Sequence, residues 1–169
     1  MTQTIEVQEL GRTIAYTFED LLKYHGPGSP GGVAHAFKVM ERAFAQLSPD
    51  DPPQRREIAV RTSFGGPGAR DGVEAVTRAV TGDRFTVDPA LARPERGRVL
   101  ERFVFEVSYG ERSVTLLLRE GFVTEEFIDL ARKKDRSDEE REHLDVLKAE
   151  MAERVIGAAA ADVYDVADA

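Results

Sequence analysis

Residues 24–31 restrict the fold more than any other stretch, because they join a glycine- and proline-rich loop to a long amphipathic helix. Ser29 suits the N-cap position, and Pro30 suits the first helical position, where its missing N–H loses no partner. Beyond Pro30, apolar side chains recur at three- and four-residue steps: Val33, Phe37, Met40, Phe44 and Leu47. This spacing predicts a helix that buries one face and holds His25 just ahead of its N-terminus.

The rest of the chain predicts an α+β fold in a single domain. A chain of 169 residues is large enough for one domain with its own core, which we assign to residues 1–157. The Ala- and Asp-rich residues 158–169 have little to bury and are expected to form a frayed tail. Pattern and turn signals predict strands at 57–64, 84–87, 100–109 and 112–119 and helices at 18–23 and 69–80, with residues 4–10 a strand or an extended arm.

The two runs around Gly110 are typical of an antiparallel hairpin, and two further helices follow Thr124 and the capping box that begins at Ser137. We therefore expect an antiparallel-rich sheet packed against helices, with a helical C-terminus.

The charge of the chain disfavours one class of function, nucleic-acid binding. The formal net charge is −8, and residues 120–169 hold 7 basic and 15 acidic groups, so the chain lacks the concentrated positive surface that nucleic acid requires.

The absence of cysteine excludes disulfides, a thiolate zinc site and a cysteine nucleophile. No stretch has the apolar length of a membrane span, and no basic start precedes an apolar core, so we expect a cytoplasmic protein without a membrane partner.

His25 is the leading candidate for chemistry. The glycines and prolines around it keep bulk away from a ring that titrates near neutrality, although the same ring is also suited to hydrogen bonding with loop backbone. His35 falls opposite the apolar stripe of its helix and His143 lies among charges, so both are interpreted as solvated surface residues.

A second glycine-rich segment, residues 65–68, precedes the next predicted helix and repeats the design of the first. Asp71 and Glu74 are three residues apart and share a face of that helix. They favour either complementation of the helix dipole or a site in which Asp71 is a general base or metal ligand. Neither glycine segment matches a phosphate-binding motif, so nucleotide binding is disfavoured. No cofactor is predicted, although a divalent metal on His25 and Asp71 stays chemically possible.

Residues 25–31, His-Gly-Pro-Gly-Ser-Pro-Gly, resemble the His-Gly-His-x-Cys-Pro-Gly signature of proteins similar to the E-type subunit of formylmethanofuran dehydrogenase. Residues 71–74, Asp-Gly-Val-Glu, resemble that family's Asp-Ala-Ile-Gln element, and the resemblance runs from about residue 18 to residue 119. It implies an α+β core, a homodimer and a cleft between the two glycine segments. The chain departs from the family at Pro27, Ser29, Gly68 and Ala79, where the family has histidine and cysteines.

Two function hypotheses follow. In the first, the protein is an enzyme (a lyase, isomerase or hydrolase) in which His25 and Asp71 perform metal-independent acid–base catalysis on an anionic organic substrate. In the second, it is a non-catalytic small-molecule-binding protein, or an accessory protein of a larger oxidoreductase-type complex. We favour the enzyme, because glycine segments that converge on a histidine and an aspartate lower the stability of the protein, which a purely structural role would not require. The predicted substrate-binding residues are Gly28, Ser29, Arg61, Ser63, Gly66, Arg70 and Glu74.

Overall fold

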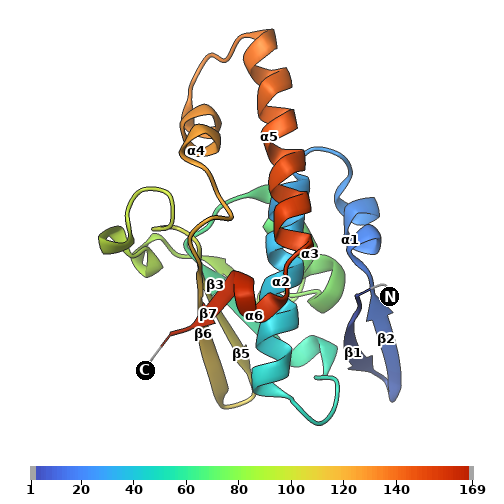
Figure 1. Cartoon of the computed structure of the whole chain (residues 1–169). Coiled ribbons are helices and arrows are strands. Elements are labelled where there is room, and N and C mark those ends of the chain that lie inside the picture. Colours follow the sequence, from blue (N-terminus) through green and yellow to red (C-terminus); the bar gives the residue numbers. More distant parts are fainter. Residues whose placement is uncertain (1–2, 168–169) are drawn as a thin grey trace.

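The computed structural model describes residues 3–167 (Figure 1). Its helices are α1 (Phe18–His25), α2 (Pro30–Leu47), α3 (Pro67–Thr77), α4 (Glu125–Arg132), α5 (Asp138–Ile156) and α6 (Ala160–Val163). Its strands are β1 (Ile5–Glu9), β2 (Arg12–Tyr16), β3 (Ile58–Thr62), β4 (Phe85–Val87), β5 (Val104–Tyr109), β6 (Arg112–Leu118) and β7 (Tyr164–Val166). Short 3₁₀ turns occupy Arg55–Glu57, Pro89–Leu91 and Pro94–Arg96.

Five strands form the main sheet in the order β4-β3-β5-β6-β7, and only the β3–β4 pair is parallel. The predicted hairpin is confirmed as β5–β6, which turns at Gly110 with a φ of 62°. A glycine suits this turn because the positive φ would strain another residue. Strands β1 and β2 make a separate two-stranded sheet. The α+β prediction is therefore confirmed.

Helix α2 is the centre of the core and packs against α1, α3, α5 and strands β5 and β6. Its predicted apolar stripe is buried, as expected. The expectation that the opposite face is solvated is wrong, since every residue from 31 to 40 is buried. Because other elements cover α2 on all sides, His35 is fully buried rather than on the surface.

The predicted capping box is confirmed at α5, where it consists of Ser137 and Glu140. Thr17 and Asp20 form a second box at α1. Helix α1 extends two residues beyond its predicted end, so His25 lies in the last helical turn and not in the loop. The loop that follows is short, and it brings the chain from α1 to α2.

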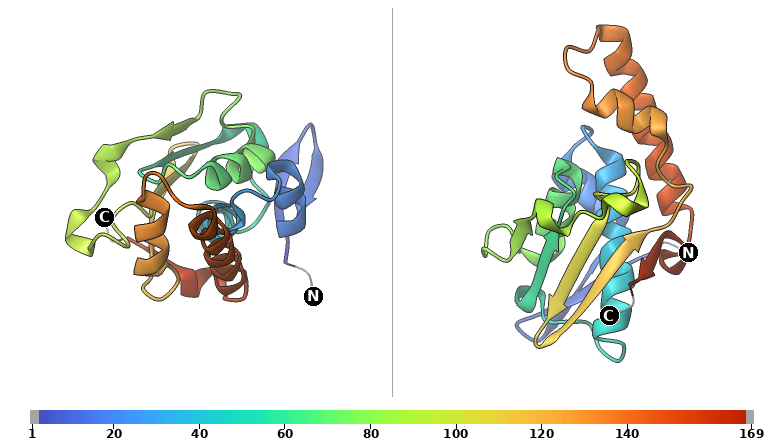
Figure 2. Two further views of the ribbon diagram at one scale, coloured as in Figure 1. Left: turned by 90° about the horizontal axis from the view of Figure 1, so that it is seen from above. Right: turned by 90° about the vertical axis from the view of Figure 1, so that its left-hand side faces the viewer.

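Helices α4 and α5 form a hairpin whose far end extends beyond the rest of the molecule (Figure 2). The part of α5 nearer Gly157 packs against α2, and in Figure 1 it lies in front of the upper part of α2. Helix α4 contacts α5 near the far end. No helix within residues 3–167 is long and apolar enough to cross a bilayer.

The expectation of a frayed tail at residues 158–169 is wrong for the residues that the structure describes. Helix α6 is followed by β7, which pairs with β6 through Leu118 and Tyr164. Tyr164 is fully buried, and its hydroxyl bonds Nδ1 of His35 at 2.8 Å. One aromatic side chain therefore anchors a segment that is otherwise poor in apolar residues. Residues 168 and 169 lie outside the described part.

Candidate functional site

His25 and Asp71 meet in the folded protein, although they are 46 positions apart in the sequence. Nδ1 of His25 lies 2.8 Å from Oδ2 of Asp71, so the end of α1 is tied to α3. The other carboxylate oxygen of Asp71 lies 3.6 Å from Nη1 of Arg70. Because a carboxylate only accepts hydrogen bonds, Nδ1 of His25 carries the proton in this contact.

The imidazole of His25 is enclosed rather than open to a ligand. Its side chain is 8% exposed, whereas that of Asp71 is 27% exposed. Nε2 of His25 is buried and has no hydrogen-bond partner within residues 3–167. This nitrogen faces the loop after α1, since a Cβ on Gly28 would lie 3.9 Å from it. The loop therefore covers the ring nitrogen of His25 that Asp71 leaves without a partner.

Three other predicted site residues have partners of their own and do not contact His25 or Asp71. Two of them, Arg61 and Ser63, lie at the main sheet. Arg61 is exposed on β3 and lies 3.5 Å from both Asp88 and Glu106. The hydroxyl of Ser63 donates to the carbonyl oxygen of Arg102 at 2.8 Å. Both side chains thus have local structural partners.

Glu74, the third, acts at the other end of α3. Its carboxylate accepts a hydrogen bond from the Thr81 N–H at 2.8 Å and pairs with Arg78 at 3.3 Å. Burial alone would raise the pKa of Glu74, but the Thr81 N–H and the Arg78 charge together hold it below its ordinary value. Glu74 therefore stabilises the end of its own helix and does not join Asp71.

A pocket of about 440 Å³ lies beside the two glycine segments. One wall contains Ser29, Gly32 and residues 64–68, and the other is the α4–α5 hairpin. The hairpin contributes apolar side chains: Phe127, Ile128, Ala131, Leu144 and Met151. Ser29 and Gly66 are predicted site residues that line it, whereas His25 and Asp71 do not. We expected the imidazole of His25 and the carboxylate of Asp71 to share a cavity between the glycine segments. Neither side chain lines the pocket that the structure forms there.

Four cationic side chains complete the lining: Arg102, Arg132, Arg136 and Lys148. We call this cavity, with its apolar walls and these four cations, the cationic pocket. Among residues 3–167, no aspartate or glutamate lines this pocket. Four like charges in a half-enclosed site raise the local positive potential, in a protein whose net charge is −8.

Three of these cations have no carboxylate partner in the described range 3–167. Nη1 of Arg136 donates to carbonyl oxygens at the end of α4, and Nζ of Lys148 donates to the carbonyl oxygen of Gly28 at 3.1 Å. Arg132 lies 3.7 Å from a Glu101 carboxylate oxygen. Most of the positive charge in the pocket is therefore not neutralised.

The N-termini of α2 and α3 add to this potential. Neither helix has an acidic residue in its first turn, and Ser29 occupies the predicted N-cap of α2 without a capping hydrogen bond from its hydroxyl. Helices α1, α4 and α5, by contrast, each have an acidic residue in the first turn and an N-cap side chain that accepts a backbone hydrogen bond. Gly32 and Gly68, from the first turns of α2 and α3, line the cationic pocket. Uncapped first-turn N–H groups and the positive end of the helix dipole favour anions, so the pocket has the electrostatic character of an anion site.

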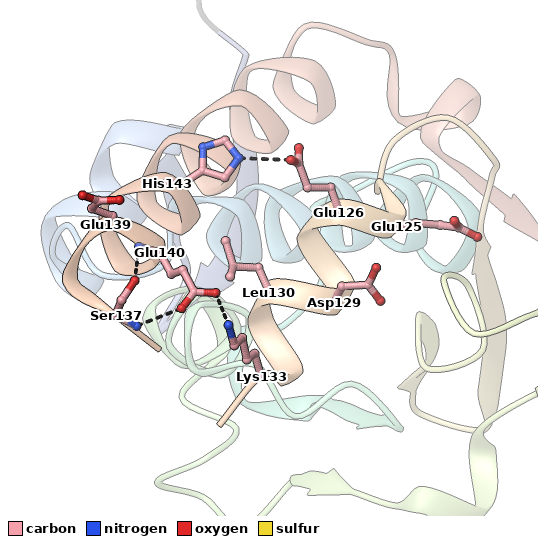
Figure 3. A pocket seen from close by; sticks show the side chains of 9 residues that line it. All are labelled: Glu125, Glu126, Asp129, Leu130, Lys133, Ser137, Glu139, Glu140 and His143. Atoms are coloured by element: carbon pink, nitrogen blue, oxygen red, sulfur yellow. Dashed lines mark hydrogen bonds and ion pairs between the residues drawn. The ribbon is translucent and has the colours of Figure 1, made fainter. Parts of the chain in front are cut away.

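A second hollow lies between α4 and α5, away from the glycine segments, and it is predominantly acidic (Figure 3). Its side chains already pair with one another: His143 with Glu126 at 3.1 Å, and Lys133 and Ser137 with Glu140. His143 is half-exposed, which confirms its interpretation as a surface residue. No group of three or more potential metal ligands occurs in residues 3–167. The His143–Glu126 and Lys133–Glu140 pairs join the two helices of the hairpin.

Sequence reasoning did not identify the cations of the cationic pocket. Arg132, Arg136 and Lys148 belong to a segment in which acidic residues outnumber basic ones, and Arg102 precedes a strand without any motif around it. No local pattern distinguishes these side chains from ordinary surface charges. Only the tertiary fold brings the two walls together.

In comparisons with protein families and with curated proteins, no family model and no curated protein matches this chain. The resemblance to the E-type subunit of formylmethanofuran dehydrogenase therefore stays a prediction that depends on the two motifs alone.

Proposed function

We propose that the protein binds a small organic anion in the cationic pocket. The observation that carries the proposal is the lining itself, which has four cationic side chains and no carboxylate. Its volume of about 440 Å³ is within the roughly 300–1,000 Å³ range of small-molecule sites. An anion there would gain charge-assisted hydrogen bonds, each worth about 1.5–3 kcal/mol.

The test is calorimetric titration with a panel of small carboxylates and phosphate esters. We expect at least one to bind with a dissociation constant below about 1 mM, and Arg102→Gln to weaken it at least about tenfold. Arg12→Gln is the matched control, because Arg12 is exposed on β2, outside the pocket, and its loss changes the net charge equally. Failure of every anion to bind, or equal losses in both variants, would contradict the proposal.

Catalysis by His25 and Asp71 is a second candidate function. It is favoured by the 2.8 Å contact at Nδ1, which leaves Nε2 of His25 buried and without a partner in the described residues. A histidine that a carboxylate orients in this way is suited to act as a general base. The substrate would occupy the cationic pocket, and the loop at Gly28 would have to move aside for Nε2 to reach it. No metal or other cofactor is required.

Product analysis separates the two candidates. The tightest-binding anion of the panel is incubated with the protein and followed by NMR. Conversion by the natural protein but not by His25→Gln supports acid–base catalysis in a lyase, isomerase or hydrolase. Recovery of the anion unchanged supports a binding or accessory role and contradicts catalysis on that compound.

A cytoplasmic location stays a prediction from the sequence. The resemblance to the E-type subunit of formylmethanofuran dehydrogenase would add two further properties: homodimerisation and, for an accessory protein, a place in an oxidoreductase-type complex. The supporting evidence is the two sequence motifs. Light scattering tests the first property directly, because a homodimer has twice the 18.7 kDa mass of one chain. A mass of 18.7 kDa at high concentration would contradict it.

A further inference from the structure

We infer that the ligand of the cationic pocket is an amphipathic acid, that is, an aryl or acyl body carrying one anionic head group. This inference rests on the proposed function and narrows its ligand class. It depends on which hydrogen-bonding groups the pocket offers and which it lacks.

The polar side chains of the lining are almost entirely donors. Arg102, Arg132, Arg136 and Lys148 can only donate hydrogen bonds, and the Ser29 hydroxyl is the one side-chain oxygen acceptor in the lining. A sugar, a nucleoside or an amino acid brings several donors, which would lose water and find almost no side-chain acceptor there. Each buried polar group left unsatisfied disfavours binding. The ligand is therefore rich in acceptors and poor in donors.

The rest of the lining is apolar and comes from both walls. Phe127, Ile128, Leu144 and Met151 lie on the hairpin, and Phe64 lies opposite, after β3. The Phe64 ring is held in place because it stacks on Phe103, with centroids 4.5 Å apart. A purely polar anion would leave this surface in contact with water, whereas an aryl or acyl body would cover it.

The α4–α5 hairpin supplies both cations and apolar side chains to the pocket. Arg132 and Arg136 follow Phe127 and Ile128, and Lys148 falls between Leu144 and Met151. A compact ligand therefore contacts both kinds of side chain at once. This arrangement favours a molecule with an anionic end and an apolar end over a polyanion.

The absence of tryptophan from the chain permits a direct test, since an indole ligand can be excited without background from the protein. The probe is indole-3-propionate, titrated with protein and followed by indole fluorescence. We expect saturable binding, at least about tenfold weaker binding of the uncharged indole-3-propionamide, and no binding of tryptamine. Competition with octanoate and octyl phosphate then identifies the preferred head group.

Two alanine-to-aspartate variants, one in the pocket and one outside it, test whether the probe binds at this site. Ala131→Asp adds a carboxylate to the pocket, whereas Ala149→Asp adds one to an exposed position of α5 outside it. We expect only Ala131→Asp to abolish probe binding. If citrate or inorganic phosphate binds more tightly than the indole acid, and Arg102→Gln weakens it, the amphipathic assignment is wrong while the anion proposal stands. If no anion binds, both are wrong.

Discussion

His35 shows how a single buried residue depends on distant parts of the chain. It is fully buried on α2, and its Nδ1 bonds the hydroxyl of Tyr164, 129 positions later. Burial lowers the pKa of His35 to about 3, because the charged ring would lose its hydration. Nε2 of His35 has no partner in residues 3–167. The ring is therefore held neutral in an aromatic environment that includes Phe103, at 4.9 Å between centroids.

This environment predicts a pH-dependent stability. Below pH 6.5 the unfolded chain protonates His35 while the folded chain does not, until the pH approaches 3. The free energy of unfolding should therefore fall as the pH drops through this window, by roughly 1.4 kcal/mol per pH unit from this residue. Urea titrations of the natural protein and of His35→Leu, at several pH values from about 4 to 7, isolate the contribution.

The stability advantage of the natural protein over His35→Leu should shrink steadily as the pH falls and should reverse by about pH 4. The single substitution leaves the Tyr164 hydroxyl buried without its partner, which costs about 1–3 kcal/mol near neutral pH. The double variant His35→Leu, Tyr164→Phe should recover much of that loss. Parallel pH profiles for the natural protein and His35→Leu would contradict the assignment of a neutral, buried ring.

At the scale of single residues, the sequence predicts one pair of side chains that the structure brings into contact. It singled out His25 and Asp71, which contact each other, because glycines and prolines mark the loop beside the histidine. It misplaced His35, because the periodicity of α2 shows which face is most apolar but not whether other elements cover the second face. That depends on β7, a strand with no recognisable sequence pattern.

At the scale of elements, the glycine segments allow α2 and α3 to approach closely. A Cβ on Gly68 would overlap the carbonyl oxygen of Ser29 and lie 2.9 Å from the Val33 nitrogen. A Cβ on Gly32 would lie 3.0 Å from the Ala69 nitrogen. The two first turns therefore cross with backbone against backbone. This contact explains why glycines occur at both helix starts and why their N–H groups lie beside one pocket.

The crossing predicts that alanine destabilises the protein at Gly68 but not at Gly65. Gly68→Ala should lower the free energy of unfolding by about 2 kcal/mol or more, because the clashing atoms are backbone and cannot rotate away. Gly65→Ala should change it by no more than about 0.5 kcal/mol, since a Cβ there meets nothing within 4 Å. Thermal or urea unfolding measures both. Equal stabilities of the two variants would contradict the close crossing.

Most elements are predictable from local signals, and the exceptions have physical causes. Capping boxes, the α2 stripe and the Gly110 turn are encoded by neighbouring residues. Strand β2 lacks a clear alternation because several of its side chains are exposed, and β7 has only three residues. Short strands of this kind depend on the partner that receives them, which the local sequence does not specify.

At the scale of the whole molecule, charge is distributed unevenly. The chain has a formal net charge of −8, but the cationic pocket is lined by four basic side chains and by no carboxylate from residues 3–167. These side chains come from the segment before β5 and from the α4–α5 hairpin. The sequence predicts the glycine wall of this pocket, through Ser29 and Gly66, but not the opposite wall, because nothing local indicates where the hairpin packs.

The most direct test of the account is a crystal structure of the protein with indole-3-propionate at saturating concentration. We predict the indole against the apolar side chains of the α4–α5 hairpin, with its carboxylate about 2.7–3.2 Å from a nitrogen of Arg102 or Lys148. An empty cationic pocket, or a ligand ordered only elsewhere on the molecule, would contradict the claim that this pocket is the functional site.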